Sequence, residues 1–139
     1  MSKLFDLRNK NVLLTGASKG MGLAMAHGLV NHGANVVVSS RKLDQCEKAV
    51  EIINESIGKE KAFAFSCNAS SKDELNALAE FSLSKLGSIT TLVCNAGVNS
   101  FFGSMSEIDD ESYDKTMVLS LIHISEPTRR RGISYAVFC

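Results

Sequence analysis

One turn with three glycines decides the fold, Thr15-Gly16-Ala17-Ser18-Lys19-Gly20-Met21-Gly22. It follows a short apolar run, residues 11–15, and precedes residues 20–31, where apolar side chains recur at helical spacing. A strand, a glycine-rich turn and a helix in this order can cradle a phosphate, because the free N–H groups and the dipole at the helix start attract an anion. Gly16 would let the chain leave the strand, Gly20 would admit a pyrophosphate and Gly22 would let the helix pack closely. Purely structural glycines in an ordinary turn are the alternative.

The alternation of apolar runs and helical patterns continues along the chain. Further strands are expected at residues 35–39, 61–66 and 91–94, and further helices at residues 43–57, from Ser71 to Leu86, and from Asp109 or Asp110 through Met117. Ser71 and Glu74 have the spacing of a capping box. The spacing in the first helix puts one set of residues on one side: Met21, Ala24, Met25, Gly28 and Leu29.

Strands that alternate with helices predict crossover connections and a parallel sheet covered by helices on both faces. We therefore expect an α/β, three-layer Rossmann fold with a doubly wound parallel sheet of strand order 3-2-1-4, truncated after the fourth strand.

Composition excludes several classes of protein. The chain has 139 residues, with 15 basic and 15 acidic side chains. This balance argues against partners such as nucleic acid or a membrane surface. No apolar run reaches the roughly 18 residues of a membrane span, and the N-terminus lacks the pattern of a secretion signal. The four cysteines form no Cys-x-x-Cys pair, so we expect neither a metal site nor disulfides, and a cytoplasmic protein.

Two motifs resemble the short-chain dehydrogenase/reductase family. The spacing Gly-x-x-x-Gly-x-Gly in residues 16–22 matches its glycine signature, and Asn95-Ala96-Gly97 follows the fourth expected strand as the family's Asn-Ala-Gly does. In that family the asparagine stabilises the central sheet and the segment lines the cofactor site. The resemblance implies that the following residues bind the cofactor: Gly16, Ser18, Lys19, Gly20, Met21, Gly22, Asn95, Ala96 and Gly97.

The end of the second strand bears on the choice of cofactor. Relatives that prefer NAD tend to place an aspartate there, for the ribose 2′-hydroxyl. This chain has Ser39-Ser40-Arg41-Lys42. Arg41 and the two serines can bind a 2′-phosphate, and Lys19 is the other basic position that relatives preferring NADP use. We therefore expect NADP rather than NAD, with two ordinary surface cations as the alternative. Asn68 and Ala69 stand where relatives contact the adenine ring.

Ser39-Ser40-Arg41-Lys42 together with residues 98–104 resembles NADP-dependent carbonyl reductases, and Phe101 and Phe102 are expected near the substrate side of the cleft or in plain loop packing. The family's catalytic serine and Tyr-x-x-x-Lys are missing, so we assign no catalytic residue to this chain. We expect a truncated oxidoreductase whose intact, homo-oligomeric form transfers a hydride between NADP(H) and a small carbonyl or alcohol substrate. The alternative is a non-catalytic, sensor-like dinucleotide-binding module of the same fold.

The C-terminal residues form a separate segment. Residues 119–129 resemble the in-frame translation of a transposase-type sequencing adapter, and residues 133–139 resemble the translation of its continuation. We therefore interpret residues 1–118 as the N-terminal part of a dinucleotide-binding Rossmann domain, and residues 119–139 as an artefactual tail.

Overall fold

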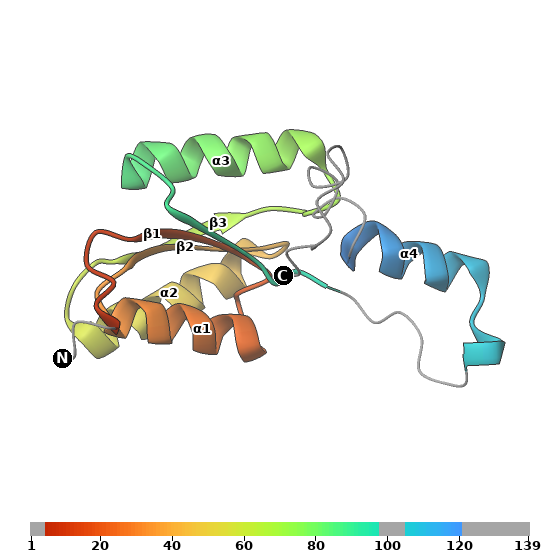
Figure 1. Ribbon diagram of the computed structural model, residues 1–139, viewed down its shortest axis with the longest axis horizontal. Coiled ribbons are helices and arrows are strands. Elements are labelled where there is room, and N and C mark those ends of the chain that lie inside the picture. The colour runs from red at the N-terminus through yellow and green to blue at the C-terminus, as the bar shows by residue number, and fades with distance from the viewer. Residues whose placement is uncertain (1–4, 98–104, 121–139) are drawn as a thin grey trace, which may run out of the picture. The chain divides into compact units, whose positions relative to one another are not determined.

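The computed structural model describes residues 5–97 and 105–120 (Figure 1). The elements are β1 (Asn11–Thr15), α1 (Gly20–Asn31), β2 (Asn35–Ser40), α2 (Leu43–Ile57), β3 (Ala62–Ser66), α3 (Lys72–Leu86), β4 (Thr91–Cys94), the 3-10 helix η2 (Met105–Glu107) and α4 (Asp110–Ser120). Every expected strand and helix is present; the bounds differ by at most one residue, except that α4 extends to Ser120, beyond Met117. The chain divides into two compact units, Met1–Asn95 and Ala96–Cys139, and the first holds the sheet.

The sheet has the order β3-β2-β1-β4, and each pair of neighbouring strands is parallel. Val12 of β1 lies opposite Val36 of β2 on one side and opposite Thr91 of β4 on the other. This order confirms the expected three-layer Rossmann fold. Because all four strands run the same way, their carboxyl ends lie along one edge of the sheet, where open sheets of this kind bind ligands.

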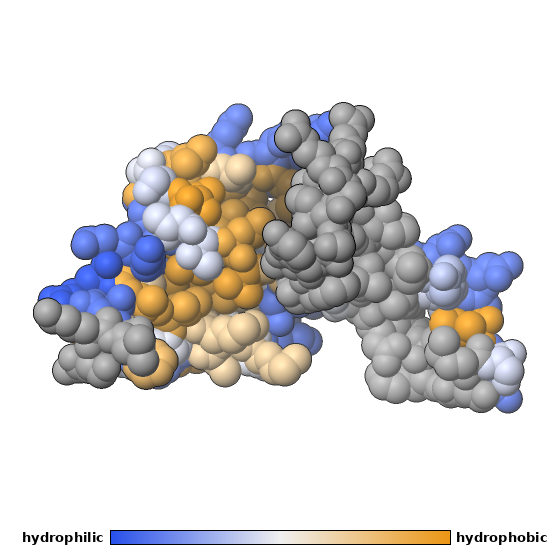
Figure 2. Space-filling view, in the orientation of Figure 1, coloured by the Kyte–Doolittle hydropathy of each residue, from blue (hydrophilic) through white to orange (hydrophobic). Residues whose placement is uncertain are grey.

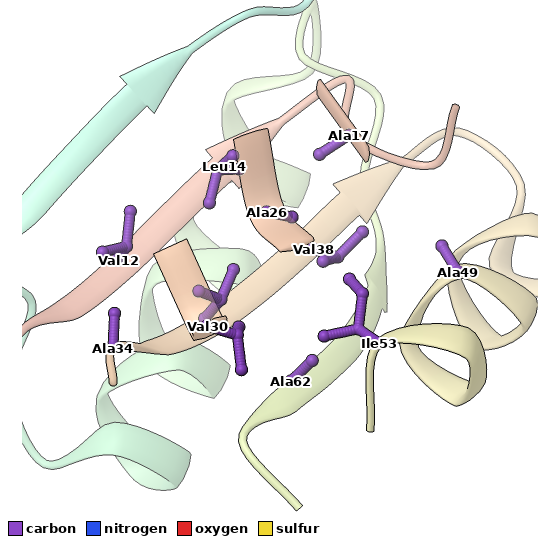
Figure 3. Close-up of a cluster of buried hydrophobic side chains, with 11 residues drawn as sticks. Val12, Leu14, Ala17, Ala26, Val30, Ala34, Val38, Ala49, Ile53 and Ala62 are labelled. Atoms are coloured by element: carbon purple, nitrogen blue, oxygen red, sulfur yellow. The ribbon is translucent and has the colours of Figure 1, made fainter. Parts of the chain in front are cut away.

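The core lies on both faces of the sheet. On one face, alternate residues of β1 and β2 pack against α1 and α2; Leu14, Val38, Ala26 and Ile53 belong to this cluster (Figure 3). On the other face, Leu13 and Val37 pack with Leu78 of α3. A strand buried on both faces needs an unbroken apolar run, which explains the composition of β1 and β2.

The buried side of α1 differs from the one that the spacing indicated. Gly22, Ala26 and Val30 are buried, whereas Met21 is 79% exposed and Met25 is 37% exposed. Apolar residues occur on more than one side of this helix, so the periodicity did not single out a face. Small side chains at two of the buried positions let α1 lie close to the sheet, and methionines would not fit there.

The capping box at α3 is confirmed in part. The Ser71 hydroxyl accepts a hydrogen bond from the Glu74 N–H, at 3.4 Å. The Glu74 carboxylate does not reach back to Ser71 but accepts from the Asn68 N–H, at 2.7 Å. The Ser71 N–H donates instead to the Asn68 carbonyl. Glu74 therefore ties the start of α3 to the segment that follows β3.

Strand β4 pairs with β1 alone among the strands that the structure describes. Figure 2 shows apolar residues on the visible face of the first unit. Leu92 of β4 is 56% exposed and Leu83 of α3 is 49% exposed. An edge strand with apolar side chains is the part of such a sheet most open to pairing with another strand.

Within residues 5–97 and 105–120, no helix has both the length and the apolar character needed to span a membrane.

Candidate cofactor-binding site

The glycine turn connects the carboxyl end of β1 to α1. Gly16 has φ of 64° and Gly20 has φ of 59°, both in the left-handed region that favours glycine. A Cβ added at Gly20 would meet no atom within 4 Å. Gly20 is therefore needed for its backbone conformation, and the space beside it is open to a ligand.

Gly22 is needed for a different reason. A Cβ at Gly22 would lie 2.5 Å from the carbonyl oxygen of Gly16 and 2.7 Å from Nδ2 of Asn95. Asn95 itself donates through Nδ2 to the Gly16 carbonyl at 2.8 Å, and its N–H donates to the Thr15 hydroxyl at 3.2 Å. Asn95, the first residue of the Asn-Ala-Gly segment, thus contacts Gly16, the first glycine of the turn. The lack of a side chain at Gly22 leaves the space that this contact needs.

The N-terminus of α1 is open to an anion. Lys19, the residue that precedes the helix, makes no side-chain cap hydrogen bond, and the first turn carries no acidic residue. The N–H groups at the start of a helix lack partners within the helix, and the dipole gives them a partial positive charge. Ser18 is half-buried, and Lys19 and Met21 are exposed. This arrangement can hold a phosphate or pyrophosphate.

The two serines at the end of β2 have different roles. Ser39 is buried, and its hydroxyl donates to the Leu14 carbonyl at 2.9 Å. The Ser39 carbonyl accepts from the Ala17 N–H at 3.0 Å. Ser39 therefore braces the glycine turn from inside the sheet, which differs from our expectation that its hydroxyl is available to a phosphate. A serine hydroxyl at a strand end looks the same in sequence whether it faces ligand or sheet.

Ser40 and Arg41 lie at the outer end of β2. Ser40 is half-buried, and its Oγ lies 3.1 Å from Sγ of Cys46. Arg41 is exposed, and no ion pair holds its guanidinium among residues 5–97 and 105–120. The residues after β2 include no carboxylate until Asp44.

Asn68 and Ala69 follow the carboxyl end of β3. Oδ1 of Asn68 accepts from the Ser70 N–H at 3.1 Å, so this oxygen shapes the turn into α3. Ala69 is half-buried. The Cys67 N–H donates to the Ser40 carbonyl at 2.8 Å, which joins this segment to the end of β2.

The first unit therefore brings the predicted residues from Gly16 to Asn95 to the carboxyl ends of its four strands. Ala96, which is half-buried, and Gly97, which is exposed, belong to the second unit. Phe101 and Phe102 lie outside the described residues. Among the described side chains, no group of three His, Cys, Asp or Glu residues is placed to hold a metal ion.

Sequence reasoning missed two residues of this region. The Thr15 hydroxyl accepts from the Asn95 N–H. Cys46 lies under Ser40, although its spacing in residues 43–57 predicted only a core position. Thr15 and Asn95 are 80 residues apart in the chain, and Ser40 and Cys46 are only six apart but lie in different elements, so no local pattern marks either contact.

Comparison with known proteins points to one family. The family described as short chain dehydrogenase matches residues 10–129. Dehydrogenase/reductase SDR family member 4 of Caenorhabditis elegans is 37% identical over 106 residues, which cover 76% of this chain and 40% of the relative. The human protein of the same name is 34% identical over 122 residues, which cover 87% of this chain and 43% of the relative. The chain thus spans less than half the length of these relatives.

Solved structures agree with the fold. A short-chain type dehydrogenase/reductase from Mycobacterium marinum superposes with a TM-score of 0.76 at 30% identity, over 84% of this chain and 44% of that one. A 3-ketoacyl-(acyl-carrier-protein) reductase from Brucella melitensis, complexed with NADH, superposes with a TM-score of 0.75 at 29% identity, over 83% of this chain and 45% of that one.

Proposed function

The chain belongs to the short-chain dehydrogenase/reductase family, and we propose that it is the dinucleotide-binding part of a reductase that transfers a hydride between NADP(H) and a small carbonyl or alcohol substrate. The observation that carries this proposal is the open N-terminus of α1, reached through a glycine turn that Asn95 holds in place. As further parts of the proposal, the parent protein is homo-oligomeric and cytoplasmic.

The residues present fit a dinucleotide. Gly20 leaves space next to the start of α1. Glycine at position 22 avoids the overlap that a Cβ would make with the turn backbone and Asn95. The N–H groups at the start of α1 would hold the pyrophosphate. The bound cofactor would supply the hydride. This chain's own part is to bind and orient it.

The end of β2 supports NADP over NAD. A carboxylate there would repel a 2′-phosphate, and the nearest one along the chain after β2 is Asp44, in the first turn of α2. Arg41 is exposed and holds a charge that can pair with a phosphate through two hydrogen bonds. Lys19 offers a second cation from the glycine turn.

Replacing Arg41 tests this preference. We expect the chain to bind NADPH more tightly than NADH, and Arg41→Ala to weaken NADPH binding about 10- to 100-fold while changing NADH binding by less than about twofold, because a hydrogen bond to a charged group is worth about 1.5–3 kcal/mol. Isothermal titration calorimetry with both dinucleotides measures the two affinities.

Lys48→Ala is the matched control, since Lys48 is an exposed cation on α2 and the net charge changes equally. It should leave both affinities nearly unchanged. Equal binding of NADPH and NADH by the unaltered chain would contradict the preference, and no binding of either would contradict the proposed function.

We place the catalytic step in residues outside this sequence. No tyrosine in it is followed by lysine at the fourth position: Tyr113 is followed there by Met117, and Tyr135 by Cys139. The chain alone is then a binder without turnover, and residues 119–139 are a translated adapter rather than part of the gene.

Sequencing the source DNA across codon 118 tests this division. We expect a reading frame that departs from Leu119 and continues to a serine and a Tyr-x-x-x-Lys motif. Codon 118 is the place to test because the family match extends to residue 129 and therefore includes the first residues of the tail. A genomic frame that encodes Leu119 to Cys139 would show that the tail is native.

A further inference from the structure

Ser40 is the last residue of β2 and is held from two sides. Its carbonyl accepts from the Cys67 N–H of the segment after β3, at 2.8 Å. Its side chain lies on the same face of the strand as Val36 and Val38, because side chains alternate along a strand. That face packs against α1 and α2. The Ser40 hydroxyl therefore lies above the start of α2.

Cys46 lies beneath this hydroxyl. Its side chain is fully buried in the first turns of α2, with Sγ 3.1 Å from Oγ of Ser40 and 4.0 Å from the Ser40 carbonyl oxygen. Burial raises the pKa of the Cys46 thiol above its ordinary value. The thiol therefore keeps its proton at neutral pH and can donate it either to the Ser40 hydroxyl, at 3.1 Å, or to the Ser40 carbonyl oxygen, at 4.0 Å.

The proton of the Ser40 hydroxyl is weakly held. Its acceptors in the chain are the Lys42 carbonyl at 3.3 Å, longer than the ordinary length of about 2.7–2.8 Å between oxygens, and Sγ of Cys46 at 3.1 Å, a weak acceptor, since either atom of that pair can donate. The Lys42 N–H approaches Oγ at 3.4 Å. When the Cys46 thiol is the donor of its pair, Oγ accepts from Sγ and from the Lys42 N–H, and its own proton can turn to a better acceptor. An anionic oxygen next to Arg41 would be such an acceptor.

We propose that Cys46 is a positioning residue for cofactor selection: its thiol donates to Oγ of Ser40, so that the Ser40 hydroxyl donates to the phosphate on the ribose 2′-oxygen beside Arg41. This inference rests on the proposed function. Cys46 itself does not touch the nucleotide and acts only through Ser40. Substituting it should change the discrimination between phosphorylated and unphosphorylated ribose rather than adenosine binding in general.

Two small probes isolate this half of the site. Adenosine 2′,5′-bisphosphate carries the 2′-phosphate, and 5′-AMP lacks it, so the ratio of their dissociation constants measures the selectivity for that phosphate. We expect Cys46→Ala to reduce this ratio about three- to tenfold, because the hydrogen bond from the Ser40 hydroxyl to the charged phosphate is weakened but not removed. We expect Cys46→Ser to keep the ratio within about twofold of the unaltered chain. Calorimetric titration of the full chain gives both constants.

Controls separate positioning from stability. Ile53→Val removes one methyl group from the same buried side of α2 and should lower stability without changing the ratio. In a Ser40→Ala background, Cys46→Ala should cause no further loss of selectivity, because the two residues act as one unit. Circular dichroism checks that each variant is folded.

The outcomes are distinct. An unchanged ratio in Cys46→Ala, or a second, additive loss in the Ser40→Ala background, would overturn the inference and leave the proposed function intact. If the unaltered chain bound both probes equally, the preference for a 2′-phosphate would fail, and the inference with it.

Discussion

Gly22→Ala is expected to lower the free energy of unfolding by about 2–4 kcal/mol and to abolish dinucleotide binding. The new Cβ would lie 2.5 Å from the Gly16 carbonyl oxygen and 2.7 Å from Cα of Ala17. Both are backbone atoms, so no side-chain rotation relieves the overlap. The turn must move, and the 2.8 Å hydrogen bond from Asn95 to Gly16 is lost with it.

Gly28→Ala is the matched control for this substitution. Gly28 lies in the same helix, α1, and a Cβ there would meet nothing within 4 Å. Alanine is the better helix former, so this variant should be neutral or more stable by up to about 1 kcal/mol. Urea unfolding followed by circular dichroism gives both free energies, and NADPH titration gives binding. Two variants of equal stability would show that the turn is not packed as described.

Much of the first unit follows from local pattern. β1 and β2 read as unbroken apolar runs because they are buried on both faces, and the glycines after the helices mark where α2 and α3 end. The strand order follows from the alternation of strands and helices together with the position of the glycine turn. These features depend on residues close together in sequence.

The details of packing do not follow from local pattern. Met21 and Met25 fit a helical stripe as well as Ala26 and Val30 do, and only the closeness of α1 to the sheet decides between them. Ser39 and Ser40 are adjacent and chemically identical, yet the alternation of side chains along β2 turns one hydroxyl into the sheet and the other toward Cys46. Such choices are made by neighbours from other elements.

The contact between the glycine turn and the Asn-Ala-Gly segment could be predicted in part. The family resemblance predicts that the asparagine of Asn-Ala-Gly stabilises the sheet, and Asn95 does bind the end of β1. The specific partners, the Gly16 carbonyl and the Thr15 hydroxyl, are about 80 residues away in the chain. Because such contacts need the parallel pairing of β1 and β4, they become visible only with the fold.

Neighbouring isoleucines of α2 allow a test of whether this core is tightly packed. Ile53 is fully buried in the cluster between α2 and the sheet (Figure 3), whereas Ile52 is 56% exposed. Ile53→Ala is expected to lower the free energy of unfolding by about 2–5 kcal/mol, since it leaves a cavity that the surrounding strands cannot close. Ile52→Ala should change it by less than about 0.5 kcal/mol.

The difference between the two variants is the informative quantity. Both remove the same atoms from adjacent positions of one helix, so helix propensity and the unfolded chain contribute almost equally to each. Urea titrations of the full chain, with the slopes compared as well as the midpoints, measure it. Equal, small losses would mean that α2 is collapsed onto the sheet without specific packing. A difference of several kcal/mol between the two losses would mean that the buried residues Cys46, Ala49 and Ile53 pack specifically against the sheet. Such packing would also hold Cys46 in contact with Ser40.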